Sequence, residues 1–227
     1  MRIVAFGGGG LGSYGGRRPL IEHVLSLTGK EDPSLCYLGT AMGDNSDYAL
    51  MFYDAARELG VEASHVNLFP QPNVRDLRAH LLAQDAIYVG GGSVANLLAV
   101  WRAHGVDTVM REAWEAGVVL SGTSAGSLCW FAGGTTDSFR PELDPFTNGL
   151  GLIPASHAPH YDSEPRRRPL YQQLVRDGVI PPGWAADDHV GLVFEGTELA
   201  EAVTIREGAA AWRVERDGET RIEPRRL

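Results

Sequence analysis

The stretch Val118-Val119-Leu120-Ser121-Gly122-Thr123-Ser124-Ala125-Gly126 decides the fold of this chain. Its apolar start is typical of a buried strand and its end is the pattern Gly-x-Ser-x-Gly, after which residues 127–131 are predicted to be helical. Glycines on both sides let the backbone turn sharply, so that the Ser124 hydroxyl points into open space. The amino end of a helix offers free N–H groups to an oxyanion. The pattern predicts a nucleophile elbow, with an ordinary Gly/Ser turn as the alternative.

The composition is that of an ordinary soluble protein. The chain has 227 residues, of which 44% are hydrophobic, so it can bury a core and fits a single domain over residues 1–227. A formal net charge of −9 argues against nucleic acid as the main partner, because nucleic-acid binding needs a basic surface. Residues 166–168 form the one concentrated basic run, which is too short for such a surface.

The sequence also indicates a location. No apolar run approaches the roughly 20 residues that span a bilayer, and the amino-terminal segment reaches glycine too early for the apolar region of a signal peptide. Cys36 and Cys129 lie in apolar surroundings and are expected to be buried free thiols, which favours a reducing compartment. We expect a cytoplasmic protein with no membrane partner, and a homodimer stays open.

Strand-like and helix-like segments alternate through the first two-thirds of the chain. Strands are expected at residues 3–6, 35–38, 63–68, 86–89 and 118–120, and helices at 19–27, 46–59, 74–82, 94–103 and 106–116. This alternation predicts an α/β fold with a mostly parallel sheet and helices on both faces. Ligands of such sheets bind at the carboxyl ends of the strands, where the turns at residues 90–92 and 122–126 both fall.

After residue 149 the pattern changes. A strand at 152–156 and a helix at 169–176 are followed by several short strands between residues 191 and 214. Residues 216–225 resemble a polar hairpin around Asp217-Gly218. Short antiparallel strands are therefore expected in the carboxyl-terminal part of the domain.

The glycine run Gly7-Gly8-Gly9-Gly10-Leu11-Gly12 formally matches the dinucleotide-binding pattern G-x-G-x-x-G. Two observations argue against that function. Residues 13–19 continue as a loop where a helix should already have begun, and no second strand ends in an acid at the expected offset. A loop bordering the active site is the preferred interpretation, and a non-catalytic small-molecule or nucleotide-binding protein is the alternative.

A serine nucleophile needs a base, for which the chain offers seven histidines. His160 follows Pro159 at a predicted strand end and enters a polar loop, which makes it the better candidate for an exposed imidazole. With His157 it forms a His-x-x-His pair that could ligate a metal. No convincing third ligand is evident, so neither a metal nor another cofactor is predicted.

The proposed chemistry needs two further groups, an orienting acid and an oxyanion hole. Asp187 and Asp188 lie at another apparent strand end, and Asp137 lies between the serine and the histidine in sequence. These residues leave the choice of acid open. The N–H group of Ala125 is one natural oxyanion donor, and another could come from residues 90–92, where missing side chains allow close approach to a substrate.

Together these residues resemble the peptidase E family of serine peptidases, the aspartyl dipeptidase group that also includes cyanophycinases. The shared landmarks, in the family's order, are Tyr88-Val89-Gly90-Gly91-Gly92, Asn96-Leu97-Leu98, the elbow at Gly122–Gly126 and Ala158-Pro159-His160-Tyr161. They extend the resemblance over most of the chain. It implies an α/β fold related to class I glutamine amidotransferases, with serine in place of cysteine at the elbow.

The resemblance also implies roles for individual residues. Four of them surround the reacting carbonyl: Ser124 as nucleophile, His160 as base, and the amides of Gly91 and Ala125 as oxyanion donors. For the third member of the triad it favours Asp188, while Asp187 and Asp137 stay open.

Two departures from the family concern the substrate. Ser93 stands where the family commonly has asparagine, and the loop after His160 is shorter than in the aspartyl dipeptidases, where an arginine pairs with the substrate's N-terminal aspartate. Arg166 and Arg167 are the expected substrate-binding residues, with Arg168 as a further candidate. We expect a serine peptidase that hydrolyses short peptides through an acyl-enzyme, with Asp-Xaa dipeptides as one substrate class. An esterase-like serine hydrolase is the alternative.

Overall fold

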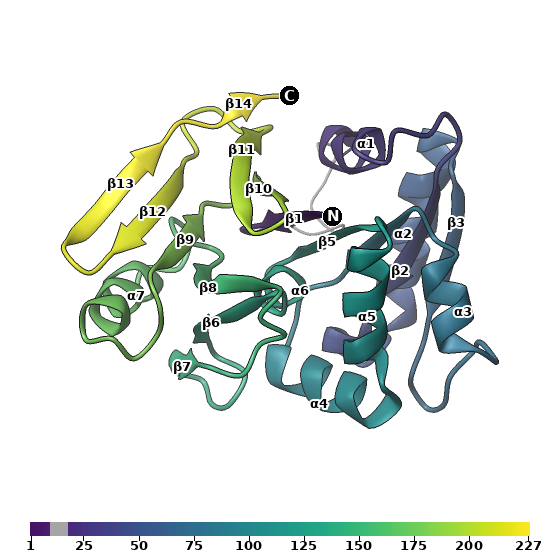
Figure 1. Ribbon diagram of the computed structural model, residues 1–227, viewed down its shortest axis with the longest axis horizontal. Helices are drawn as coiled ribbons and strands as arrows, with labels where there is room; N and C mark the ends of the chain where they lie inside the picture. Colours follow the sequence, from purple (N-terminus) through teal and green to yellow (C-terminus); the bar gives the residue numbers. More distant parts are fainter. Residues whose placement is uncertain (10–17) are drawn as a thin grey trace.

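The computed structural model describes residues 1–9 and 18–227, and two sheets organise this part of the chain (Figure 1). The larger sheet contains eight strands in the order β14-β11-β10-β1-β5-β4-β2-β3. In chain order they are β1 (Arg2–Phe6), β2 (Ser34–Leu38), β3 (Glu62–Val66), β4 (Ala86–Val89), β5 (Val119–Thr123), β10 (Val190–Glu195), β11 (Glu198–Thr204) and β14 (Arg225–Arg226). The neighbours from β1 to β3 all pair in parallel, whereas β10 is antiparallel to both β1 and β11.

Helices cover both faces of the larger sheet because its strands are apolar on both sides. In chain order they are α1 (Arg18–Ser26), the 3₁₀ turn η1 (Thr40–Met42), α2 (Ser46–Leu59), α3 (Leu77–Leu82), α4 (Val94–His104) and α5 (Val106–Glu115). Leu35 and Tyr37 of β2 pack in the cluster that contains residues of α1 and α2, while Cys36 and Leu38 pack with residues of α3, α4 and α5. The alternation along one strand thus places the two helical layers on opposite faces.

The smaller sheet holds six strands among the described residues, in the order β13-β12-β9-β8-β6-β7. They are β6 (Phe131–Thr136), β7 (Asp144–Phe146), β8 (Ile153–Ala158), β9 (Gly183–Ala186), β12 (Ala211–Glu215) and β13 (Gly218–Ile222). The helix α7 (Arg167–Arg176) packs on it through Tyr171 and Val175, at the left of Figure 1. The expected hairpin is confirmed, since β12 and β13 are antiparallel and Glu215 pairs with Gly218.

Local sequence signals fix most helix boundaries. The side chain of Asn45 accepts a hydrogen bond from the Asp47 amide at the start of α2, and Gly60 ends that helix in the left-handed conformation. The predicted helix at 74–82 begins later than expected, at Leu77, because the side chain of Asp76 accepts a hydrogen bond from the Ala79 amide.

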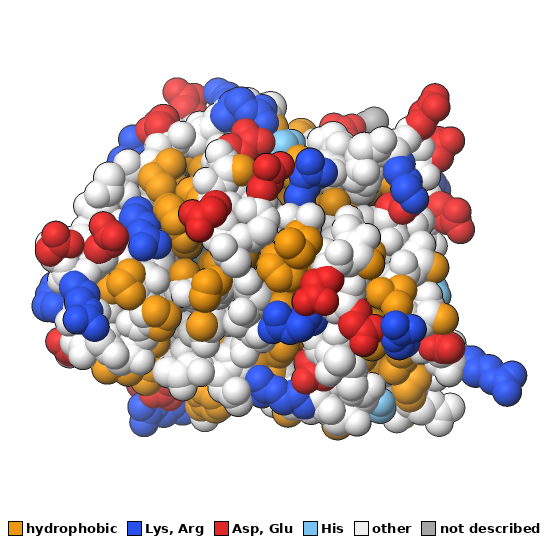
Figure 2. Space-filling model, viewed as in Figure 1, with side chains coloured by type: hydrophobic (Ala, Val, Ile, Leu, Met, Phe, Trp, Pro, Cys, Tyr) orange, Lys and Arg blue, Asp and Glu red, His pale blue; other side chains and the backbone are white. Residues whose placement is uncertain are grey.

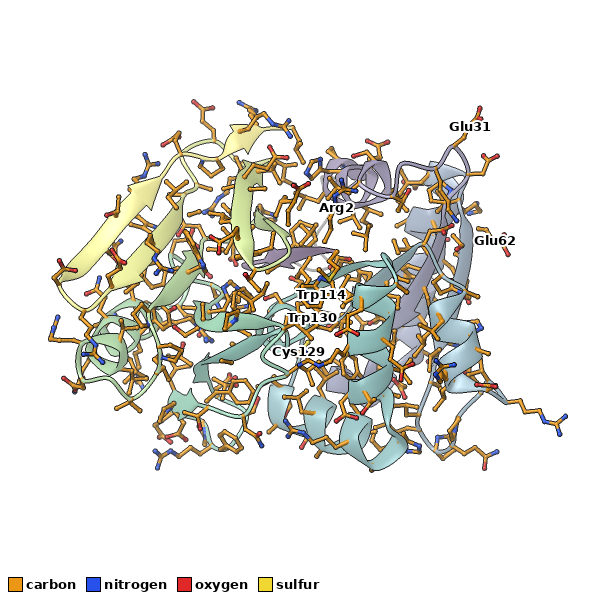
Figure 3. The ribbon with its side chains drawn as sticks, viewed as in Figure 1. Arg2, Glu31, Glu62, Trp114, Cys129 and Trp130 are labelled. Carbon is orange, nitrogen blue, oxygen red and sulfur yellow. The ribbon has the colours of Figure 1, made fainter. Side chains whose placement is uncertain are left out.

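The predicted helix after the elbow is wrong beyond its first turn. The helix α6 spans only Ala125–Leu128, and the chain enters β6 at Phe131. Trp130 and Phe131 are fully buried, and Figure 3 shows Cys129 and Trp130 near the centre of the molecule. A short apolar run buried on all sides has no period that distinguishes strand from helix.

Three findings bear on what the composition predicts. Cys36 and Cys129 are buried free cysteines, as predicted. The face seen in Figure 2 carries acidic and basic side chains interspersed. Within the described ranges, no helix combines the length and the apolar character needed to cross a membrane.

Candidate active site

Ser124 occupies a sharp turn between β5 and α6. Its φ of 55° and ψ of −117° are strained for a residue with a side chain, as at a nucleophile elbow. A Cβ atom on Gly122 would lie 2.2 Å from the carbonyl oxygen of Gly126, and one on Gly126 would lie 2.2 Å from the carbonyl oxygen of Val89. Both glycines are therefore required sterically for the turn to pack against β4.

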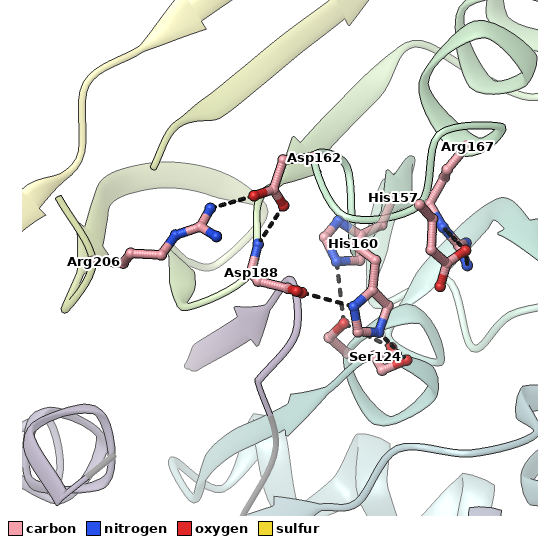
Figure 4. Close-up of polar contacts among 9 residues, drawn as sticks. Ser124, His157, His160, Asp162, Arg167, Asp188 and Arg206 are labelled. Carbon is pink, nitrogen blue, oxygen red and sulfur yellow. Dashed lines mark hydrogen bonds and ion pairs between the residues drawn. The ribbon is translucent and has the colours of Figure 1, made fainter. Parts of the chain in front are cut away.

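A hydrogen-bonded chain connects Ser124, His160 and Asp188 (Figure 4). The His160 Nε2 atom lies 2.9 Å from the Ser124 Oγ atom, and the Nδ1 atom lies 2.7 Å from Asp188 Oδ1. The histidine follows β8 and the aspartate follows β9, so both arrive at the end of the smaller sheet that faces the elbow. This geometry lets Nδ1–H donate to the carboxylate while Nε2 accepts the serine proton.

The other two candidate acids lie elsewhere. The Asp187 carboxylate is buried and accepts hydrogen bonds from the Ala210 amide, at 2.9 Å, and from Trp212 Nε1, at 3.3 Å. Burial raises the pKa of Asp187. Asp137 is exposed after β6 and lines a cavity with Arg166. In contrast, the hydrogen bond from His160 lowers the pKa of Asp188, which keeps that carboxylate ionised near neutral pH.

The amino-terminal glycines border this chain of residues, as predicted. A Cβ atom on Gly8 would lie 1.8 Å from Asp188 Oδ1 and 2.4 Å from His160 Nδ1. The His160 amide also donates to the Gly7 carbonyl, at 3.0 Å. The rest of the proposed nucleotide loop, residues 10–12, lies outside the described residues. Gly7–Gly9 thus form one wall of the site because β1 lies between β5 and β10.

Gly8→Ala should reduce kcat/KM at least about 100-fold, because the added methyl group must displace His160 or Asp188. The same crowding should lower the free energy of unfolding by about 1–3 kcal/mol. Gly196→Ala is the control: its Cβ atom would meet nothing within 4 Å, although φ is 59°. It should lower stability by about 1 kcal/mol with wild-type kinetics. Urea unfolding and steady-state kinetics measure both, and wild-type turnover by Gly8→Ala would contradict this packing.

The two predicted oxyanion donors flank Ser124. A Cβ atom on Gly91 would lie only 3.2 Å from the Ser124 Cβ atom and 3.8 Å from its Oγ atom. Ala125 opens α6 directly after the serine. Among the residues that the structure describes, neither amide donates a hydrogen bond. The neighbouring amides of Gly90 and Ser93 donate to Leu38 and Ala41, which fixes the glycine turn.

His157 is a core residue. It is fully buried, stacks on Phe131 at 4.6 Å between ring centroids, and lies 3.1 Å from both the Ser127 hydroxyl and the Trp184 carbonyl. Burial lowers its pKa to about 3, so the ring is neutral in the folded protein. Within residues 1–9 and 18–227, no group of three or more His, Cys, Asp or Glu side chains is arranged to hold a metal ion.

The three consecutive arginines have different surroundings. Arg167, expected to bind substrate, is instead buried: Nη1 donates to the Thr135 carbonyl at 2.6 Å, and Nε and Nη2 donate to Glu164 at 3.0 and 2.6 Å. Its guanidinium therefore ties α7 to β6. Arg168 lies over the Trp212 ring, at 4.2 Å from its centroid. Arg166 is exposed and lines a cavity of about 330 Å³ with Asp137.

Comparison with known proteins identifies the family. The model of peptidase family S51 matches residues 3–202, a range that contains Ser124, His160 and Asp188. A Bacillus subtilis (strain 168) protein named as the uncharacterized peptidase YgaJ is 42% identical over 213 residues, which are 94% of this chain and 91% of that protein. Peptidase E of Shewanella denitrificans is 28% identical over 210 residues, covering 87% of this chain and 80% of its own length.

A solved structure has the same fold. The crystal structure of a peptidase from an acI-B1 Actinobacterium superposes with a TM-score of 0.74 at 16% identity, covering 98% of this chain and 94% of the other. The family match and the peptidase E relative confirm the resemblance to peptidase E inferred from the sequence. Since the family match includes the elbow, the histidine that contacts it and every strand from β1 to β10, the chain belongs to peptidase family S51 and is a serine peptidase.

Proposed function

We propose that this peptidase hydrolyses short peptides through an acyl-enzyme formed on Ser124. The observation that carries the proposal is the continuous hydrogen-bonded chain from Ser124 through His160 to Asp188. His160 Nε2 takes the serine proton as Oγ attacks the scissile carbonyl carbon. Asp188, ionised at neutral pH, orients the imidazole and stabilises the imidazolium that forms.

The later steps use the same groups. The amides of Gly91 and Ala125 donate to the oxyanion of the tetrahedral intermediate. The His160 imidazolium gives its proton to the leaving amine, which breaks the C–N bond and leaves an ester on Ser124. Water then attacks this ester with His160 again as base, and the serine is regenerated with release of the acid product.

The fold supports a further part of the proposal, a relationship to class I glutamine amidotransferases within one peptidase domain over residues 1–227. In support, the nucleophile follows a central strand of a sheet whose neighbours β1, β5, β4, β2 and β3 are parallel. Ligands of such sheets bind at the carboxyl ends of the strands, which is where Ser124 lies.

We infer a preference for Asp-Xaa dipeptides from the cavity beside the triad. Ser163, Glu164 and Arg166 line it. The Glu164 amide donates a hydrogen bond to the His160 carbonyl, at 3.1 Å, so the segment that lines the cavity begins directly after His160. The Arg166 guanidinium is exposed there and can pair with the carboxylate of an aspartyl side chain. Asp137 lines the same cavity from the end of β6.

A peptide panel tests the proposal. Asp-Leu should be cleaved with a kcat/KM at least about 100-fold above that of Asn-Leu, because the isosteric amide leaves Arg166 without its ionic partner. Arg166→Gln should lower kcat/KM for Asp-Leu about 10- to 100-fold and change that for Asn-Leu little. Arg221→Gln is the control, since Arg221 pairs with Glu223 beside β13, away from the cavity.

Each result of the panel has a defined meaning. Equal cleavage of Asp-Leu and Asn-Leu would exclude the aspartyl preference and leave the peptidase chemistry intact. Hydrolysis of activated esters without cleavage of any peptide would instead identify an esterase-like serine hydrolase.

A further inference from the structure

Asp188 is held by contacts outside the triad. Its backbone N–H donates to Asp162 Oδ1, at 2.9 Å, and the Oδ2 atom of Asp162 pairs with the guanidinium of Arg206 (Figure 4). Asp162 lies in the loop that starts at His160, whereas Arg206 comes from the segment after β11. The Asp162 carboxylate therefore connects the loop that follows His160, the turn that contains Asp188 and the carboxyl-terminal part of the chain.

The segment that carries Arg206 is itself fixed to the turn that contains Asp188. The hydroxyl of Thr204 accepts a hydrogen bond from the Arg206 amide, at 3.1 Å, and donates to the His189 carbonyl, at 3.0 Å. Thr204 is buried, so this connection is shielded from water. As a result, Arg206 is connected to the Asp188 turn twice, from its backbone through Thr204 and from its guanidinium through Asp162.

Charge gives this arrangement a second effect. Asp162, Asp187 and Asp188 bring three carboxylates together within one loop cluster. The charge of Asp162 contributes to the raised pKa of Asp187, and Arg206 opposes that rise. Without the guanidinium, the Asp162 carboxylate would lie beside the Asp188 turn with no cation paired to it.

We propose that Arg206 and Asp162 form a clamp that positions Asp188 to orient His160. This inference rests on the proposed function, because it assumes that the triad acid must be placed accurately for Ser124 to react. Neither residue touches the serine, so both act through the aspartate. Misplacement of a reacting group by about 1 Å can cost about 100-fold in rate, so a partial loosening should cost about 10-fold.

The rate of Ser124 labelling by a fluorophosphonate tests the clamp without depending on peptide preference. Arg206→Met should slow labelling about 10-fold, and Arg206→Lys, which keeps the charge, should restore it to within about 3-fold of wild type. Asp162→Ala should also slow it about 10-fold. Asp162→Asn retains an oxygen that can accept the hydrogen bond of the Asp188 amide, so its labelling rate should fall only about 3-fold.

The double variant distinguishes a clamp from two independent surface contacts. Arg206→Met combined with Asp162→Ala should be slowed about 10-fold, as each single variant is, because the two residues act as one unit. If the two contacts were independent, their effects on the labelling rate would multiply, and the double variant would be slowed about 100-fold. Arg225→Met is the matched control: it breaks an exposed Arg225–Glu201 ion pair on neighbouring strands and should label at the wild-type rate.

The outcomes separate this inference from the proposed function. Absence of wild-type labelling at Ser124 would remove the acyl-enzyme mechanism and with it the basis of the clamp. Normal wild-type labelling together with an unchanged rate in Arg206→Met would overturn the clamp alone. Thermal unfolding should change by only a few degrees, since the pair is partly exposed. If Arg206→Met does not fold, Arg206→Gln provides the same comparison with Arg206→Lys.

Discussion

Ser124→Ala should lower kcat for peptide hydrolysis by about 10⁵- to 10⁶-fold while the protein stays folded. The substitution removes one oxygen atom, and with it both the nucleophile and the proton that His160 would accept. The residual activity would come from the oxyanion donors and from substrate binding. Steady-state kinetics with Asp-Leu and thermal unfolding measure the two parts of this expectation.

A second serine variant controls for damage to the strand. Ser121 lies in β5 three residues before the nucleophile, is fully buried, and donates to the Ile87 carbonyl at 2.8 Å. Ser121→Ala should lower the free energy of unfolding by about 1 kcal/mol through loss of that hydrogen bond, with turnover retained. Activity of Ser124→Ala above about 1% of wild type would contradict the assignment of Ser124 as the nucleophile.

The features that sequence predicts well here are those set by neighbouring residues. The elbow is one, because Gly122 and Gly126 are needed for contacts made within the turn and with the adjacent strand. The helix α2 is another: its predicted range, 46–59, matches the observed one, since Asn45 caps its start and Gly60 its end. Such local signals are sufficient where tertiary packing agrees with them.

The features that sequence missed depend on distant contacts. The sequence does not predict the strands β6 and β7, because they are stabilised by pairing with each other and, for β6, with β8 rather than by their own pattern. The burial of Arg167 has the same origin. Nothing in three consecutive arginines indicates which one will meet Glu164 on one side and Thr135 of β6 on the other.

The choice between Asp187 and Asp188 shows this limit most clearly. The two residues are adjacent just after β9, yet their carboxylates have entirely different partners. Because β9 pairs with β12, the carboxylate of Asp187 accepts hydrogen bonds from Ala210 and Trp212. The carboxylate of Asp188 contacts His160 instead. The pairing of β9 with β12, which decides the outcome, is not visible in the sequence around the aspartates.

Asp188→Asn should lower kcat about 10⁴-fold with little change in KM or in stability. The amide can donate to His160 Nδ1, which would leave a proton on Nε2, where the serine proton must be accepted. The backbone of residue 188 would keep its hydrogen bond to Asp162, so the turn should stay in place. The defect is therefore expected in protonation and charge rather than in folding, and kcat with Asp-Leu measures it.

Asp137→Asn provides the contrast, because it makes the same chemical change in an acid that lines the cavity and does not contact His160. Its charge can act on a bound peptide but not on the tautomer of the imidazole, so the expected change is mainly in KM and at most about 10-fold. A 10⁴-fold loss of kcat in Asp137→Asn together with an active Asp188→Asn would reverse the assignment of the triad acid. The expected kcat of Asp137→Asn exceeds that of Asp188→Asn by a factor of about 10³ or more. The loss of an exposed charge cannot produce such a factor through solvent, because its effect at a partly exposed site amounts to about 1 kcal/mol.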